Sequence, residues 1–176
     1  MKLVLVAALF ACLTASVSSE EKNAPFTLAV VPSQSSQAER SITMAATQSR
    51  TFYVVLTNTS DHAQPVWQTL YSWGFWTISF EFTMPDGKHL HVSRNHNESF
   101  TKNSPATFLV PSGEQQIYPV QLDGSWDNLP QFPKRGITRI TLKAIYEVGS
   151  TPEASQHNVW VGRVESPNYD LVLEHW

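Results

Sequence analysis

Apolar and polar residues alternate with a period of two along most of this chain, and no helical stripe of useful length is present. The clearest alternation covers residues 76–83. One set of positions there is apolar and the other is polar, with Trp76, Ile78, Phe80 and Phe82 in the first and Thr77, Ser79, Glu81 and Thr83 in the second. Successive side chains of a β-strand point to opposite faces, so this segment is predicted to be a strand with one buried face.

The same pattern recurs at near-regular spacing. Further strands are predicted at residues 26–31, 42–46, 50–58, 88–93, 107–110, 116–122, 137–148, 159–164 and 169–173. Turns are expected at Pro85-Asp86-Gly87 and Pro111-Ser112-Gly113, a kink at Ser166-Pro167, and loops at 123–136 and 149–158. Many short strands separated by turn signals predict an all-β domain, an antiparallel β-sandwich.

The N-terminal segment departs from this pattern. Lys2 precedes an apolar run over residues 3–15, and Val17 and Ser19 stand at the minus-three and minus-one positions of a cleavage site. This arrangement predicts a secretory signal peptide over residues 1–19 and a single β-sandwich domain over residues 20–176. The apolar run is too short to span a bilayer comfortably, so we expect a secreted or periplasmic protein without a membrane span.

The single cysteine, Cys12, lies inside this leader. The segment Leu9-Phe10-Ala11-Cys12 loosely resembles a bacterial lipobox, so a lipid anchor at Cys12 that holds the domain at a membrane is the alternative location. If the leader is removed after Ser19, no cysteine remains, and disulfides and thiol chemistry are excluded from the domain. We therefore expect stability from packing alone.

Several segments carry a resemblance to known proteins. Thr51 to Asp61 (Thr-Phe-Tyr-Val-Val-Leu-Thr-Asn-Thr-Ser-Asp) looks like the second strand of secreted immunoglobulin-like domains, and residues 140–148 and 160–166 look like the last two strands. Ser72-Trp73-Gly74 and Phe100-Thr101-Lys102-Asn103 lie between them. Together these segments resemble an uncharacterised group of exported bacterial immunoglobulin-like β-sandwich proteins. The resemblance implies a fold and no activity, and it carries over no catalytic residue.

Charge and motifs narrow the function further. The net charge is −3, and there is no basic stripe of the kind that binds nucleic acid. The chain has no Gly-x-Ser-x-Gly motif, no cysteine nucleophile outside the leader and no glycine-rich phosphate loop. We therefore expect a protein that is not an enzyme, needs no cofactor and does not bind nucleic acid.

Aromatic residues form the sharpest local feature. Trp67, Tyr71, Trp73 and Phe75 are candidate ligand-binding residues in a cluster that continues into the strand at 76–83, and Gly74 among them is expected to mark a bulge. Exposed rings would form a flat platform for a sugar or a peptide. The alternative is that these rings cover an open end of the core. Trp126, in the loop at 123–136, is a further binding anchor or a plug of the core.

Three histidines are weak candidates for a copper or zinc site. His89 and His91 lie two residues apart on a predicted strand and therefore share a face, and His96 follows in the next loop. The alternative is a solvated outer face.

These features favour a binding module over a catalyst. The first hypothesis is a protein-interaction module outside the cytoplasm, an accessory or inhibitory subunit that uses edge strands or end loops. The second is a carbohydrate-binding module that uses the aromatic platform. The third is a metal-binding periplasmic protein.

Overall fold

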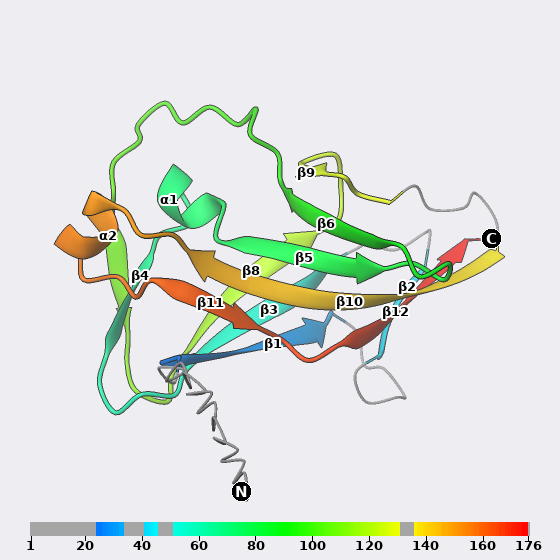
Figure 1. Cartoon of the computed structure of the whole chain (residues 1–176), viewed down its shortest axis with the longest axis horizontal. Coiled ribbons are helices and arrows are strands. Elements are labelled where there is room, and N and C mark those ends of the chain that lie inside the picture. Colours follow the sequence, from blue (N-terminus) through cyan, green and yellow to red (C-terminus); the bar gives the residue numbers. More distant parts are fainter. Residues whose placement is uncertain (1–23, 34–40, 46–50, 131–135, 176) are drawn as a thin grey trace, which may run out of the picture.

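The computed structural model describes residues 24–33, 41–45, 51–130 and 136–175 (Figure 1). The strands are β1 (Phe26–Pro32), β2 (Ser41–Ala45), β3 (Thr51–Asn58), β4 (Gln64–Trp67), β5 (Ile78–Thr83), β6 (His89–Arg94), β7 (Thr107–Val110), β8 (Gln115–Gln121), β9 (Trp126–Asp127), β10 (Gly136–Val148), β11 (Gly162–Glu165) and β12 (Tyr169–His175). Two short helices occur in these ranges, α1 (Ser72–Phe75) and α2 (Pro152–Gln156). The fold is all-β in character, as the period-two pattern predicts.

The small sheet consists of β1, β3 and β8, with β3 in the centre and both pairs antiparallel. The inward face predicted for β3 is confirmed, because Phe52, Val54 and Leu56 are fully buried. Val54 lies opposite Val30 of β1 and Tyr118 of β8, so a row of buried side chains crosses the whole sheet.

The large sheet has the order β2-β12-β10-β5-β6-β9, and β11 also pairs with β10. β10 is its long central strand, with β5 along one edge and β12 followed by β11 along the other. The pairs are antiparallel except for β12 and β2, which run parallel. The parallel pair departs from the expected pattern because β1 and β2 lie in different sheets, so the chain crosses between sheets where it enters β2.

The two sheets pack face to face, and the strands of the small sheet pass behind β5 and β10 in Figure 1. Ring contacts join the facing layers: the centroids of Phe52 and Phe80 are 5.5 Å apart, and those of Phe26 and Tyr146 are 6.1 Å apart. Burial of such rings supplies much of the stabilisation that a domain without disulfides needs. β4 and β7 form a separate two-stranded ribbon.

The predicted kink at Ser166-Pro167 separates β11 from β12. The Ser166 N–H donates to the Ala144 carbonyl oxygen, and the Ala144 N–H donates to Ser166 Oγ, both at 2.9 Å. The same hydroxyl donates to the Pro167 carbonyl oxygen at 2.8 Å. A side-chain oxygen thus replaces a backbone acceptor where the strand breaks, so the buried Ala144 N–H remains satisfied.

Two segments differ from the sequence prediction. Trp76 was expected to point inward with Ile78, but a single helical turn, α1, precedes β5 and leaves Trp76 37% exposed. Gly74 lies inside this turn rather than at a bulge. The predicted loop at 149–158 contains α2, which Thr151 caps by accepting a hydrogen bond from the Ala154 N–H.

None of the helices in the described ranges is long and apolar enough to cross a membrane. The predicted signal peptide at 1–19, with Cys12, lies outside the described residues.

Candidate functional site

Hydrogen bonds fix α1 beside the end of the large sheet. The Ser72 N–H donates to Asn103 Oδ1 at 3.1 Å, and Asn103 Nδ2 donates to Ser72 Oγ at 2.8 Å. Thr77 Oγ1 donates to the Gly74 carbonyl oxygen at 2.8 Å and closes the turn. A Cβ at Gly74 would collide with the backbone of Gln68, so the close approach requires glycine there. These contacts hold Phe75 in place at the end of the turn.

The five predicted aromatic residues do not form one platform. Trp67 is only 2% exposed, and its ring packs against Trp73, which is half-buried. Tyr71 is half-buried just before α1. Trp126 is 5% exposed and donates its Nε1–H to the Gln121 carbonyl oxygen at 2.8 Å. Trp67 and Trp126 are thus both buried and contribute to packing, and Trp126 also lies beside Arg94.

Phe75 and Trp126 are brought together by Arg94, at the end of β6. The guanidinium carbon lies 5.1 Å from the centroid of the Phe75 ring and 4.1 Å from that of the Trp126 ring. Each aromatic face is electron-rich and attracts the cation, so the two rings hold the planar group in a defined position.

The charge of Arg94 is only partly compensated. Arg94 Nη1 donates to Ser125 Oγ at 2.6 Å, and Ser125 Oγ donates to Asp123 Oδ1 at 2.5 Å. Among the described residues Arg94 forms no ion pair. Burial lowers the pKa of the Arg94 guanidinium, while the charges of Asp123 and Glu98 act in the opposite direction. A guanidinium nevertheless stays charged in proteins, so a half-buried cation remains whose one hydrogen-bond partner among the described residues is Ser125.

A cavity of about 230 Å³ adjoins this cation, and we call it the Arg94 pocket. Its lining consists of Thr69, Gly74, Phe75, Ile78, Arg94, Ile117, Tyr118, Pro119, Val120 and Trp126. Most of these residues are apolar, and Arg94 is the one charged residue among them. The pocket therefore combines one fixed positive charge with apolar walls drawn from α1, β5, β6, β8 and β9.

Further rings surround the Phe75 side of the pocket. Phe75 contacts Phe100 and Trp76 with centroid distances of 5.5 and 6.1 Å, and Trp76 also contacts His96 at 5.4 Å. Trp76 and His96 are the exposed rings of this group, whereas Phe75 and Phe100 are half-buried. Of the five rings that the sequence suggested, Phe75 and Trp126 line the pocket, and Trp76, Phe100 and His96 join them from outside that set.

Arg94 was not among the predicted site residues, although the sequence contains a signal for it. Leu90 and Val92 were predicted to face inward, and Arg94 has the same parity on the same strand. A charged residue at an inward position must keep its charge at the end of the core or against specific partners. The inward position of Arg94 in the alternating pattern could therefore have identified it as a candidate site residue.

The three histidines behave differently from one another. His89 and His91 are exposed and share a face of β6, as predicted, and His89 Nδ1 lies 3.1 Å from Thr83 Oγ1. His96 packs against Trp76 instead. Within the described ranges, no group of three or more His, Cys, Asp or Glu side chains is arranged to hold a metal ion.

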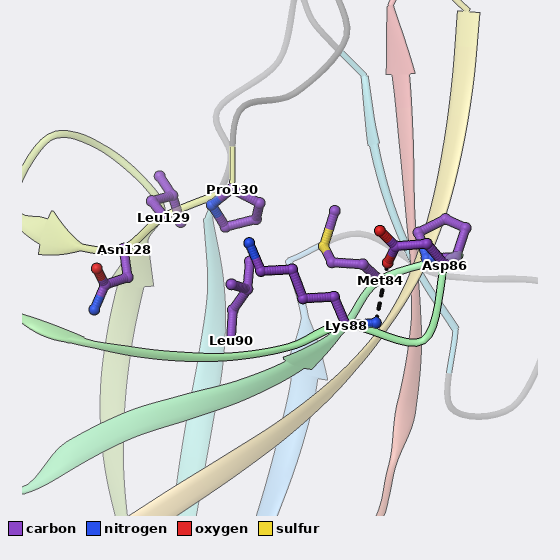
Figure 2. A pocket seen from close by; sticks show the side chains of 8 residues that line it. Met84, Asp86, Lys88, Leu90, Asn128, Leu129 and Pro130 are labelled. Carbon is purple, nitrogen blue, oxygen red and sulfur yellow. Dashed lines mark hydrogen bonds between the residues drawn. The ribbon is translucent and has the colours of Figure 1, made fainter.

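A second, larger hollow of about 570 Å³ lies at the turn between β5 and β6 (Figure 2). The Lys88 N–H donates to Asp86 Oδ1 at 3.0 Å in the predicted Pro85-Asp86-Gly87 turn. Figure 2 shows the Lys88 side chain extending across the hollow toward Pro130. Pro130 is the last described residue before 131–135, so we assign no site to this hollow.

No protein-family model matches the chain, and no curated protein sequence matches it. Its function is therefore inferred from its own residues and their geometry.

Proposed function

We propose that this chain is an exported, non-enzymatic binding module, an accessory or inhibitory subunit that holds a protein partner at the Arg94 pocket. One observation carries the proposal: a half-buried guanidinium is held between the rings of Phe75 and Trp126 without a carboxylate in ion-pair contact among the described residues. A cation held in this way is preorganised for an anionic partner, because little conformational entropy remains to be lost on binding.

The architecture supports an immunoglobulin-like β-sandwich as the scaffold. The order β1-β3-β8 in one sheet and β12-β10-β5-β6 in the other corresponds to the A-B-E and G-F-C-C′ strands of that fold. Such domains recognise partners through end loops or edge strands, and the Arg94 pocket is lined in part by the edge strands β8 and β9. The resemblance to exported bacterial immunoglobulin-like proteins supports the same scaffold.

Recognition fits this site better than catalysis does. A guanidinium does not exchange its proton near neutral pH, so Arg94 suits charge recognition rather than general acid or base chemistry. Ser125 is engaged on both sides, by Arg94 and by Asp123, rather than activated by a histidine. These features support a non-enzymatic role.

A protein partner is favoured over a glycan by the lining of the pocket. A sugar brings several hydroxyl groups, each of which needs a hydrogen-bond partner when it leaves water. Among the lining residues, Thr69, Tyr118 and Arg94 supply the polar side chains, and the rest are apolar. Carbohydrate binding remains the second candidate because Trp76 offers a partly exposed ring beside Phe100 and His96.

Export follows from the predicted leader at 1–19, with lipid attachment at Cys12 as the alternative. Fractionation of cells that express the full chain, with and without Cys12→Ala, separates the two. A soluble extracytoplasmic form in both cases supports secretion, and membrane retention that depends on Cys12 supports the anchor.

The binding proposal is tested by a thermal-shift screen against acidic peptides, neutral peptides, acidic glycans, neutral glycans and first-row metal ions. A ligand at about a hundred times its dissociation constant adds about 2.7 kcal/mol, a rise in Tm of roughly 5 °C or more for a domain of this size. We expect acidic peptides to stabilise the wild type and not Arg94→Gln. The matched control is Arg139→Gln, which removes an exposed arginine of β10. Stabilisation that is identical in wild type and Arg94→Gln would contradict the proposal.

A further inference from the structure

We infer that the Arg94 pocket takes the C-terminal residue of a partner peptide, with its terminal carboxylate on Arg94 and its apolar side chain against the cavity walls. This inference rests on the proposed function, since it names the chemical group that the same site would hold.

The free donors of Arg94 fit a carboxylate. A guanidinium presents several N–H groups in a rigid planar fork, and a carboxylate accepts two parallel hydrogen bonds from such a fork. One of the two terminal nitrogens, Nη1, donates a hydrogen bond to Ser125 Oγ at 2.6 Å. The other donors have no partner among the described residues. A bound carboxylate would complete the hydrogen bonding of a half-buried group whose desolvation is otherwise only partly compensated.

The environment makes such a contact stronger than one on the open surface. Phe75 and Trp126 shield Arg94 from water on two sides, and a lower local dielectric strengthens the attraction between opposite charges. Asp123 reaches the cation only through Ser125, so it orients the guanidinium without neutralising it by direct contact. The positive charge of Arg94 therefore remains available to an anionic ligand.

The size of the cavity suits a single residue of the ligand. At about 230 Å³ it is smaller than the pockets of roughly 300–1,000 Å³ that hold drug-sized ligands. Ile78, Ile117 and Val120 are among the apolar residues at its walls. A buried aliphatic or aromatic side chain would therefore add to the affinity by leaving water there.

A chain terminus satisfies both features at once. The C-terminal residue bears its carboxylate and its side chain on the same Cα, so charge and apolar group enter together. An internal aspartate or glutamate supplies the charge but only one or two methylene groups for the apolar walls. The pocket therefore favours a terminal carboxylate on an apolar residue over an acidic side chain within a chain.

The test uses the processed protein, purified after expression of the full chain with its own leader, and short peptides of one sequence that end in Leu, Val or Phe. Each peptide is made with a free C-terminal carboxylate and as the C-terminal amide. A third form keeps the amide and carries an internal Glu. Affinities are measured by calorimetry for wild type, Arg94→Gln, Arg94→Lys and the control Arg139→Gln.

We expect the free-carboxylate peptides to bind wild type and Arg139→Gln at least about tenfold more tightly than their amides. Arg94→Gln removes that preference, and Arg94→Lys, which keeps the charge but loses the planar fork, reduces it. Circular dichroism and Tm establish whether each variant is folded. If Arg94→Gln does not fold, the comparison of wild type with Arg94→Lys provides the test.

The other outcomes distinguish a failure of the C-terminal inference from a failure of the proposed binding function. Equal affinity for carboxylate and amide forms, or tighter binding of the internal-Glu peptide or of an acidic sugar in an Arg94-dependent manner, overturns the C-terminal inference and leaves the binding site at Arg94. Absence of any ligand whose binding depends on Arg94 overturns both.

Discussion

The guanidinium carbon of Arg94 lies 4.1 Å from the centroid of the Trp126 ring, and the two residues are paired opposite each other on β6 and β9. Arg94 and Trp126 are therefore held next to each other both by strand pairing and by side-chain contact. Trp126 is nearly buried and its ring lies 5.1 Å from that of Phe80, so the cation rests on the outer side of the core. The position of the charge is thus set by the packing of the sheets.

Replacing Trp126 should weaken both the core and the site. Trp126→Ala removes a ring that packs on Phe80 and donates to the Gln121 carbonyl oxygen, so we expect a loss of about 3–5 kcal/mol in the free energy of unfolding. Urea denaturation measures this loss. Trp126→Phe keeps part of the packing and is expected to lose less. A change below about 1 kcal/mol for Trp126→Ala would show that the ring is not part of the core.

The hydroxyl of Ser166 should matter more than its small size suggests. Ser166→Ala leaves the buried Ala144 N–H without its acceptor, and an unsatisfied buried donor costs about 1–3 kcal/mol. The control is Ser155→Ala in α2, an exposed position where we expect a change within about 0.5 kcal/mol. Equal effects of the two substitutions in urea denaturation would argue against the strand-break role of Ser166.

The register of β10 is tested by neighbouring positions. Leu142 is fully buried and faces the small sheet, so Leu142→Ala should cost about 2–5 kcal/mol. Lys143 faces outward and lies 2.7 Å from Glu165 and 3.0 Å from Glu81. Partly exposed ion pairs contribute about 0.2–1 kcal/mol, so Lys143→Ala should cost less than about 1 kcal/mol. Comparable losses at the two positions would mean that the register is wrong.

The ion pairs on the outward-facing side of β10 predict that the stability of the protein depends on pH. Lys143 holds the pKa of Glu81 and of Glu165 below the ordinary value of 4.5, because it donates hydrogen bonds to both carboxylates. Each lowered pKa means that the ion pairs stabilise the fold fully above about pH 4.5 and lose this effect as the pH falls through the folded-state pKa. The pKa of Lys143 is raised above 10.5, chiefly by Glu165, so its contribution is lost only as the pH rises beyond that value.

Thermal unfolding between pH 3 and pH 7 measures this effect. The double variant Glu81→Gln with Glu165→Gln should show a smaller fall in Tm below about pH 4.5 than the wild type. Because these side chains are more than one third exposed, the difference should also shrink in high salt. If the Tm of the double variant falls below pH 4.5 as steeply as that of the wild type, these carboxylates do not cause the loss of stability in acid.

Alternation was sufficient to predict the strands that carry most of the core. Phe52, Phe80, Leu142 and Tyr146 occupy the inward positions that the sequence pattern assigns to them. Cross-strand neighbours were not predictable in the same way, since the contact between Lys143 and Glu81 depends on the register of β10 against β5. The parallel pairing of β2 with β12 likewise joins segments far apart in the chain.

The site was predicted less well because short elements decide it. α1 is a single turn, too short to leave a periodic signal, and it reverses the expected direction of Trp76. β4 is also short, and its end buries Trp67. The pattern identified Phe75 and Trp126 as notable residues, but it did not show that Arg94 joins them.

The most direct test of the account is to observe the Arg94 side chain by NMR while a carboxylate is added. The Nε–H signal of Arg94 is assigned by its loss in Arg94→Lys, and the protein is titrated with N-acetyl-leucine and, separately, with its carboxamide. We predict that the carboxylate shifts the Arg94 Nε–H signal together with the indole N–H signal of Trp126, whereas the carboxamide leaves both in place. Arg94 and Trp126 signals that respond equally to the two compounds, or to neither, would contradict a carboxylate site at Arg94.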